Sequence, residues 1–254
     1  MKWITFDLDG TLMQNPFVGH VFPDLERLIS REVKSSDSVI AMLVKEHDRR
    51  MQFGQIVEAY DWDEIVADLL KEYGVDLQID VEELVHKHCT DGKVYLLDEH
   101  VIGTLQALKR NGYQLAVVTN GYYKYQAPVL KKLAIYDYFD LIVTPERSGY
   151  AKPDARILDE VVRQGEIIAH VGDRLDHDII MANEEGIQSV FINRKLPEAI
   201  GEKEIDSRLD AVGVEQFLKD KWHKETKLFN EPLPKLAMPK KIIKDTKELV
   251  ELFS

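Results

Sequence analysis

The chain has 254 residues, of which 44% are hydrophobic and 31% are charged, and its formal net charge is -12. This composition is ordinary for a folded globular protein, and the negative charge argues against general binding to nucleic acids or to anionic membranes. The single cysteine, Cys89, cannot form an internal disulfide, no apolar stretch approaches the roughly 20 residues of a membrane span, and no signal-peptide pattern is seen. We therefore expect a protein of the cytoplasm.

The first eleven residues organise the rest of the chain. Residues 3–6 form a short apolar run of β-branched and aromatic types, which predicts a buried strand ended by Gly10. Asp7 and Asp9 follow it, and side chains two apart on a strand point the same way. Because neighbouring carboxylates repel each other and resist burial, the pair favours chemistry: one nucleophile, one proton carrier and a cation to hold the charge. The alternative is a simple turn.

The next eighty residues have a helical pattern and no expected strand. Helices are predicted at about 21–29, 39–51, 62–73 and 81–88, the third of them stopped by Gly74. We therefore predict that residues 15–96 form a helical module inserted after the first strand.

From residue 97 onwards, strands and helices alternate. Strands are predicted at 113–118, 139–144, 167–171 and 189–192, and helices at 101–110, 126–133, 154–164 and 179–185. Short connections between such elements predict right-handed crossovers and a parallel sheet covered on both faces. The expected fold class is thus α/β, with a doubly wound parallel-sheet core (residues 1–14 and 97–254) and an inserted all-helical cap (residues 15–96).

The C-terminal part is less regular. A helix is expected at 206–219 and an extended segment at 224–240, which contains three prolines. Residues 242–243 favour a last short strand or turn, and residues 249–253 a terminal helix on the core.

Residues whose side chains can take part in catalysis or ligand binding follow the predicted strands. In a doubly wound sheet, ligands bind at the carboxyl ends of the strands. Those ends carry Asp7 and Asp9, then Thr119, Asn120 and Gly121, then the loop with Lys152, and finally Asp173 and Asp178. Acids, a hydroxyl, a lysine and a glycine turn would thus meet on one rim.

These residues form four ordered motifs that resemble the haloacid dehalogenase (HAD) superfamily of phosphohydrolases with a helical, C1-type cap. The motifs are Asp7-Leu8-Asp9-Gly10-Thr11, Val117-Val118-Thr119-Asn120-Gly121, Lys152-Pro153-Asp154 and Gly172-Asp173-Arg174-Leu175-Asp176-His177-Asp178. The resemblance covers residues 3–193, and the ordered set is more specific than any single motif.

The resemblance implies a role for each motif. Asp7 would attack phosphorus and form an aspartyl-phosphate, while Asp9 would protonate the leaving oxygen and then activate water. Lys152 would offset negative charge on Asp7 and the phosphoryl group. The phosphoryl group would be bound by the Thr119 hydroxyl and by the backbone N–H groups of Asn120 and Gly121.

The same resemblance implies a magnesium site. Asp7, the backbone carbonyl of Asp9 and Asp173 would bind Mg²⁺, and Asp178 would complete or orient the metal shell. Arg174 and His177 depart from the family's more usual residues and leave the surroundings of the metal open. A histidine at 177 either orients Asp178 or faces solvent, and Asp176 is taken as a surface acid.

The expected activity is hydrolysis of a small-molecule phosphomonoester. Haloacid dehalogenases lack the second aspartate, so Asp9 argues for phosphoryl transfer. A phosphomutase and a catalytically silent module that binds metal or phosphate remain alternatives. Phosphoserine, sugar phosphates, phosphoglycolate and nucleotides are all open as substrates.

The cap is expected to close over the site, and its side chains would then read the leaving group. The candidates are His20, Arg49, Arg50, Tyr60 and Trp62, each of which is otherwise a residue of the cap core or of the surface.

Overall fold

The computed structural model describes residues 1–229 and 231–254, and its centre is a six-stranded sheet in which all neighbouring strands are parallel. The strand order is β5-β4-β1-β6-β7-β8. The strands are β1 (Lys2–Phe6), β4 (Gln114–Val118), β5 (Leu141–Val143), β6 (Glu166–Gly172), β7 (Gln188–Ile192) and β8 (Lys241–Ile243). The predicted α/β class and parallel sheet are confirmed.

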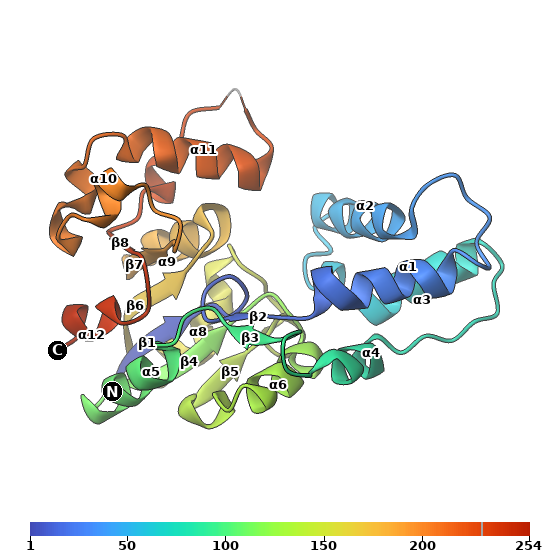
Figure 1. Cartoon of the computed structure of the whole chain (residues 1–254), viewed down its shortest axis with the longest axis horizontal. Coiled ribbons are helices and arrows are strands. Elements are labelled where there is room, and N and C mark those ends of the chain that lie inside the picture. The colour runs from blue at the N-terminus through green and yellow to red at the C-terminus, as the bar shows by residue number, and fades with distance from the viewer. Residues whose placement is uncertain (230) are drawn as a thin grey trace.

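Both faces of the sheet are covered by helices, as Figure 1 shows. Along β1, Ile4 and Phe6 belong to a core cluster with α5 (Val101–Arg110), α6 (Tyr123–Lys132) and α12 (Glu248–Leu252). Trp3 belongs instead to a cluster with α8 (Asp159–Val162) and α9 (Ile180–Glu184). Alternating side chains of one strand therefore anchor opposite layers.

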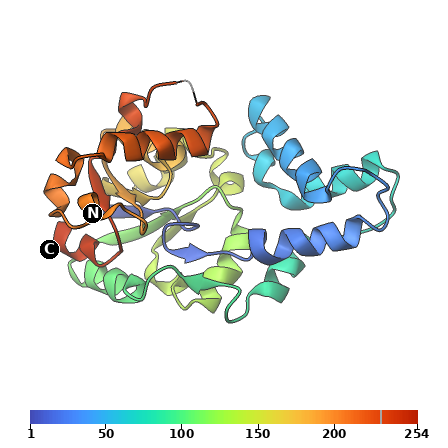
Figure 2. The same ribbon diagram turned by 45° about the horizontal axis from the view of Figure 1, so that its top comes forward.

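The cap contains four α-helices that lie beside the core in Figures 1 and 2. They are α1 (Phe22–Ile29), α2 (Val39–Gln52), α3 (Trp62–Glu72) and α4 (Val81–His88). Three of them begin at a residue whose side-chain oxygen accepts a backbone N–H of the first turn, namely Ser38, Asp61 and Asp80. Such N-terminal capping residues supply hydrogen-bond acceptors for backbone N–H groups that have no partner within the helix.

Two short strands join the cap to the core, and the prediction that residues 17–96 hold no strand was wrong. Met13–Gln14 (β2) pairs antiparallel with Tyr95–Leu96 (β3). The pairing arises because the outgoing and returning connections lie side by side, and two residues are too few to leave a periodic pattern. The domain boundaries predicted at 14/15 and 96/97 fall beside this pair and remain a prediction.

A long helical connection leads from β7 to β8. It contains α10 (Glu198–Gly201), a 3₁₀ turn (Ile205–Asp210) and α11 (Val214–Thr226). The single helix predicted at 206–219 was wrong, because the chain breaks before α11 and Gly213 adopts a φ of +86° at its start. α11 also runs into the segment expected to be extended, because Leu218 and Trp222 continue its buried face. No helix among the described residues is long and apolar enough to cross a membrane.

Candidate active site

The predicted site residues meet at the carboxyl edge of the sheet, around a cavity of about 960 Å³. Strands β4, β1 and β6 are adjacent at the centre of the sheet, and their carboxyl ends carry the second, first and fourth motifs. Six predicted residues line the cavity: Asp7, Asp9, Thr119, Asn120, Gly121 and Lys152. Cap residues line it as well, so the cavity lies between cap and core.

Lys152 forms a buried bridge between two carboxylates. Its Nζ lies 2.7 Å from Asp7 Oδ1 and 2.6 Å from Asp178 Oδ1, and its side chain is 2% exposed. Burial works against its charge, but the two acids hold the pKa of Lys152 above its usual range. Burial raises the pKa of Asp7 despite the lysine, whereas Lys152 and His170 keep the pKa of Asp178 below its usual range despite burial.

Asn120 holds the loop that carries Lys152. Its Oδ1 accepts the Lys152 backbone N–H at 2.7 Å, and its Nδ2 donates to the Lys152 carbonyl at 3.0 Å. The Nδ2 also donates to the hydroxyl of Tyr60 in the cap, at 2.9 Å. Sequence reasoning assigned only the backbone of Asn120 and missed this side-chain link between the second motif, the lysine loop and the cap.

The Asp9 carboxyl group lies beside Gln126 and has a raised pKa. Gln126 Nε2 donates to Asp9 Oδ2 at 2.6 Å, while Asp9 Oδ1 is buried and has no hydrogen-bond partner within the described part of the chain. Burial raises the pKa of Asp9 to about 6, although the hydrogen bond from Gln126 opposes it. A carboxyl group with a pKa near neutrality can both give and take a proton.

Gln126 is a site residue that the sequence prediction missed. Its Nε2 also lies 3.4 Å from Thr119 Oγ1, which in turn accepts the Gly121 N–H at 3.2 Å. A Cβ on Gly121 would lie 2.2 Å from Gln126 Nε2, so only glycine leaves room for this side chain. The only signal in the sequence was a polar residue early in the helix that follows the second motif.

Three carboxylates form the one group of described residues with metal-ligand spacing. Oxygens of Asp7, Asp173 and Asp178 all lie within 4.8 Å of one another. Burial, and then the charge of Asp7, raises the pKa of Asp173 to about 7. The Asp173 carboxylate packs against Gly10, where a Cβ would come within 2.7 Å of it and φ is +85°. Asp7 and Asp178 are buried and share Lys152, while Asp173 is partly exposed and lies 3.6 Å from Lys221, so the negative charge of the three acids is only partly offset. This oxygen set suits a hard divalent cation.

Asp178 is tied down on both of its oxygens. Oδ1 faces Lys152 and, at 3.2 Å, His170 Nε2, while Oδ2 accepts the Arg174 backbone N–H at 3.0 Å. These contacts fit a residue that orients the metal shell. The histidine in contact with Asp178 is thus His170 of β6, rather than His177 as considered from the sequence.

His177, Arg174 and Asp176 all line the cavity. Arg174 donates to the Asp176 carboxylate at 3.0 and 2.7 Å, so Asp176 is part of the cavity wall and not a plain surface acid. Burial lowers the pKa of His177 to about 4, which leaves its ring uncharged at neutral pH.

The cap contributes an aromatic wall to the cavity. Of the five cap residues predicted to read the leaving group, Tyr60 and Trp62 line the cavity. His47, Phe17 and Phe22 also line it, and the sequence prediction missed them. The other three candidates do not belong to the described lining: His20 stacks on His88, Arg49 pairs with Glu46, and Arg50 is buried inside the cap.

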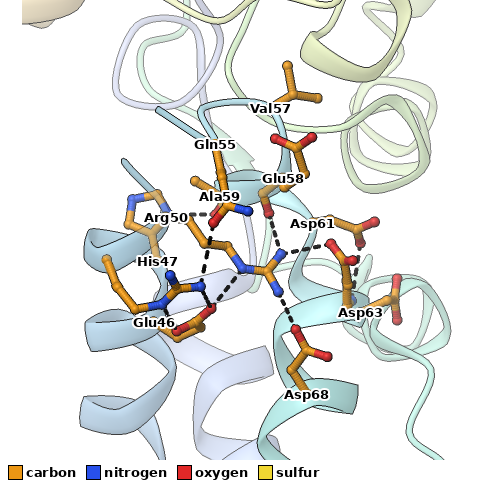
Figure 3. A network of polar contacts seen from close by, with 12 residues as sticks. Glu46, His47, Arg50, Gln55, Val57, Glu58, Ala59, Asp61, Asp63 and Asp68 are labelled. Carbon is orange, nitrogen blue, oxygen red and sulfur yellow. Dashed lines mark hydrogen bonds and ion pairs between the residues drawn. The ribbon is translucent and has the colours of Figure 1, made fainter. Parts of the chain in front are cut away.

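Arg50 is the centre of a network within the cap, shown in Figure 3. Its guanidinium donates to Glu46, Glu64, Asp68 and the Glu58 carbonyl at 2.7 to 3.0 Å. With its side chain 4% exposed, it joins α2 to α3 inside the cap.

Comparison with known proteins agrees with this geometry. The family model for haloacid dehalogenase-like hydrolases matches residues 1–186, so the chain belongs to that family. A glyceraldehyde 3-phosphate phosphatase of Methanocaldococcus jannaschii is 30% identical over 204 residues, which cover 76% of this chain and 85% of the relative. A second one, from Methanothermobacter thermautotrophicus, is 36% identical over 100 residues, or 38% of this chain and 44% of that relative.

A solved structure extends the likeness to the whole chain. A HAD phosphatase from Thermococcus onnurineus superimposes with a TM-score of 0.68 at 25% identity, covering 100% of this chain and 98% of that one. The family predicted from the four motifs is therefore confirmed, and with it the enzyme class, a hydrolase that acts on phosphate esters.

Proposed function

We propose that this protein is a Mg²⁺-dependent phosphatase that hydrolyses a small-molecule phosphomonoester through an aspartyl-phosphate on Asp7. The observation that carries the proposal is the setting of Asp7. It lines the cavity, its Oδ1 is 2.7 Å from Lys152 Nζ, and its carboxylate lies in one cluster with Asp173 and Asp178.

In the first half of the reaction, a carboxylate oxygen of Asp7 attacks phosphorus. The bond from phosphorus to the ester oxygen breaks, and Asp9 gives its proton to that oxygen, so the alcohol leaves neutral. Gln126 keeps the Asp9 carboxyl group in place through Oδ2, and Oδ1 is left to carry the proton. The positive charge of Lys152 stabilises negative charge that builds up on the phosphoryl oxygens.

In the second half, water attacks phosphorus of the aspartyl-phosphate. Asp9, now deprotonated, takes the proton from water, the bond between phosphorus and the Asp7 oxygen breaks, and inorganic phosphate leaves. Asp7 and protonated Asp9 are thereby restored. The pKa of Asp9 of about 6 supports both directions of proton transfer near neutral pH.

The proposed metal ligands are Asp7, Asp173, Asp178 and the backbone carbonyl of Asp9. A bound Mg²⁺ would supply positive charge that lets the carboxylates and a phosphate dianion share one site. Thr119 would donate its hydroxyl to the phosphoryl group, next to the backbone N–H groups of Asn120 and Gly121.

The substrate class is a small phosphorylated metabolite. Glyceraldehyde 3-phosphate is the first compound to test, because three relatives are named as phosphatases of this compound. Phosphoserine, sugar phosphates, phosphoglycolate and nucleotides are the other substrates to test. The aromatic wall formed by Tyr60, Trp62 and their neighbours would face the leaving group.

The test is phosphate release from a panel of these compounds, measured with Mg²⁺ and with a chelator. Asp7→Asn has nearly the same shape and serves as the blank. We expect Mg²⁺-dependent release from one or a few compounds and none from the variant. Release that does not need a divalent cation, or equal release by Asp7→Asn, would overturn the proposal.

A further inference from the structure

Helix α11 forms part of the cavity wall, although it lies outside the segment that the family model matches. Five of its residues and neighbours line the cavity: Lys221, Lys224, Glu225, Thr226 and Lys227. The family match ends at residue 186, so it assigns no role to them. In Figure 1, α11 lies across the top of the core, above α9.

Glu225 makes direct contact with the loop of the fourth motif. Its Oε2 accepts the backbone N–H of Leu175 at 2.9 Å and that of Asp176 at 3.4 Å. These N–H groups begin the helical turn Leu175–Ile179, directly after Asp173 and Arg174. The first N–H groups of a helix have no partner within the helix. Arg174 is the N-terminal capping residue of this turn, but its side chain makes no capping hydrogen bond. Glu225, 50 residues after Leu175, accepts hydrogen bonds from these N–H groups in its place.

Lys221 forms an ion pair with the other oxygen of this carboxylate. It lies one turn earlier on α11, and its Nζ is 3.0 Å from Glu225 Oε1 and 3.6 Å from Asp173 Oδ2. The Glu225 side chain is 5% exposed. α11 itself is anchored through Leu218 and Trp222, which are packed into a core cluster with β7 and β8. The carboxylate is therefore held by a rigid support rather than by a mobile surface side chain.

We propose that Glu225 is a positioning residue for the metal-binding loop. By holding the backbone at Leu175 and Asp176, it fixes where Asp173 points relative to Asp7. Groups that orient metal ligands in this way commonly change metal affinity by roughly 10- to 100-fold when they are removed. The inference rests on the proposed function for the identity of the cation, but the contact with the loop stands on its own.

The experiment measures two quantities in the full-length protein: amide hydrogen exchange at Leu175 and Asp176, and Mg²⁺ affinity by calorimetry. Glu225→Ala should speed exchange at these two amides and weaken Mg²⁺ binding by roughly 10- to 100-fold. Glu225→Gln keeps an acceptor oxygen and should be intermediate in both. Glu215→Ala, at an exposed position of the same helix, is the matched control and should equal the wild type.

Unchanged exchange and unchanged affinity in a folded Glu225→Ala would overturn the inference. If that variant does not fold, Glu225→Gln decides, and wild-type exchange at both amides would then overturn it. Failure of the proposed function looks different. In that case the wild type binds no Mg²⁺, or Asp173→Asn binds it as tightly as the wild type, while faster exchange in Glu225→Ala is still observed.

Discussion

Lys152 and Asp178 form an ion pair with almost no access to solvent: Nζ and Oδ1 are 2.6 Å apart, and the side chains are 2% and 1% exposed. The same ammonium group lies 2.7 Å from Asp7. One lysine thus holds Asp7, the proposed nucleophile, and Asp178, a proposed metal ligand, in a single arrangement. Its removal would leave two buried carboxylates facing each other.

Lys152→Met should therefore destabilise the fold as well as abolish turnover. Breaking a buried ion pair from one side typically costs about 3–5 kcal/mol, because the remaining charge stays buried without a partner. Denaturant unfolding measures the loss. Lys45→Met, at an exposed position of α2, should change stability by less than about 0.5 kcal/mol. Equal stability of the two variants would contradict this role of Lys152.

Asp9→Asn should affect esters according to their leaving group. The amide cannot protonate an alcohol, and loss of a general acid costs roughly 10²- to 10⁴-fold in rate. We expect kcat/KM to fall strongly for an alkyl phosphate but far less for p-nitrophenyl phosphate, whose leaving group needs no proton. Equal losses of kcat/KM for both esters would exclude Asp9 as the acid.

Gly121→Ala should impair the enzyme through Gln126. The added Cβ would lie 2.2 Å from Gln126 Nε2, so that side chain must leave Asp9. Misplacing a catalytic group by about 1 Å can cost roughly 100-fold in kcat. Gln126→Ala should give a similar loss, and the double variant should be no worse than either single one.

Gly103→Ala is the control for that substitution, because a Cβ there meets no atom within 4 Å. It should keep full activity and gain up to about 1 kcal/mol of stability, since it lies in helix α5. If the losses in the Gly121 and Gln126 single variants simply added in the double variant, the proposed coupling would be wrong.

Arg50→Met should lower stability and leave the chemistry intact. Arg50 pairs with Glu46, Glu64 and Asp68 inside the cap (Figure 3), and it is not among the described residues that line the cavity. Two of these partners are more than half exposed, so the loss should be near 2 kcal/mol rather than the full cost of a buried pair. A several-fold rise of KM in the folded variant would instead favour a role in reading the substrate.

The same network predicts a dependence of stability on pH. The hydrogen bond from Arg49 and the one from Arg50 lower the pKa of Glu46 to about 2 from its ordinary value of 4.5. A depressed carboxyl pKa contributes stability in full above the unfolded pKa, and the contribution is lost as pH falls through the folded value. Glu46→Gln should therefore flatten the loss of stability between about pH 4.5 and 2, and an unchanged slope in unfolding experiments would contradict the pairing.

The sequence predicted those parts of the site that follow buried strands. Asp7 and Asp9 directly follow a short apolar run, which can be recognised as a buried strand from the local sequence alone. Parallel strands then bring the other motifs to the same edge of the sheet. Arg50 was named as a possible substrate contact because a single sequence does not show which face of a cap helix meets another helix. The contacts of Glu225 and Gln126 depend on packing between distant segments, so Glu225 left no local signal and Gln126 left only a weak one, a polar residue early in its helix.

The C-terminal connection shows the same limit. The helix predicted at 206–219 had suitable residues, but Gly213 at a φ of +86° divides it. The burial of Trp222 extends α11 beyond its predicted end and brings Glu225 to the cavity. The local sequence pattern indicated a helix in this segment, and packing against β7 and β8 determines where α11 begins and ends.

The central claim is that Asp7 becomes phosphorylated. The most direct measurement mixes Asp9→Asn with p-nitrophenyl phosphate and Mg²⁺, quenches with acid and maps the phosphoryl group by peptide mass spectrometry. The aryl group leaves without an acid, while water is no longer activated, so the covalent intermediate should accumulate. The expected result is a phosphoryl group on Asp7 of the Asp9→Asn variant. The double variant Asp7→Asn, Asp9→Asn should carry none. Phosphorylation of a different side chain, or nitrophenol release with Asp7 left unmodified, would contradict the mechanism.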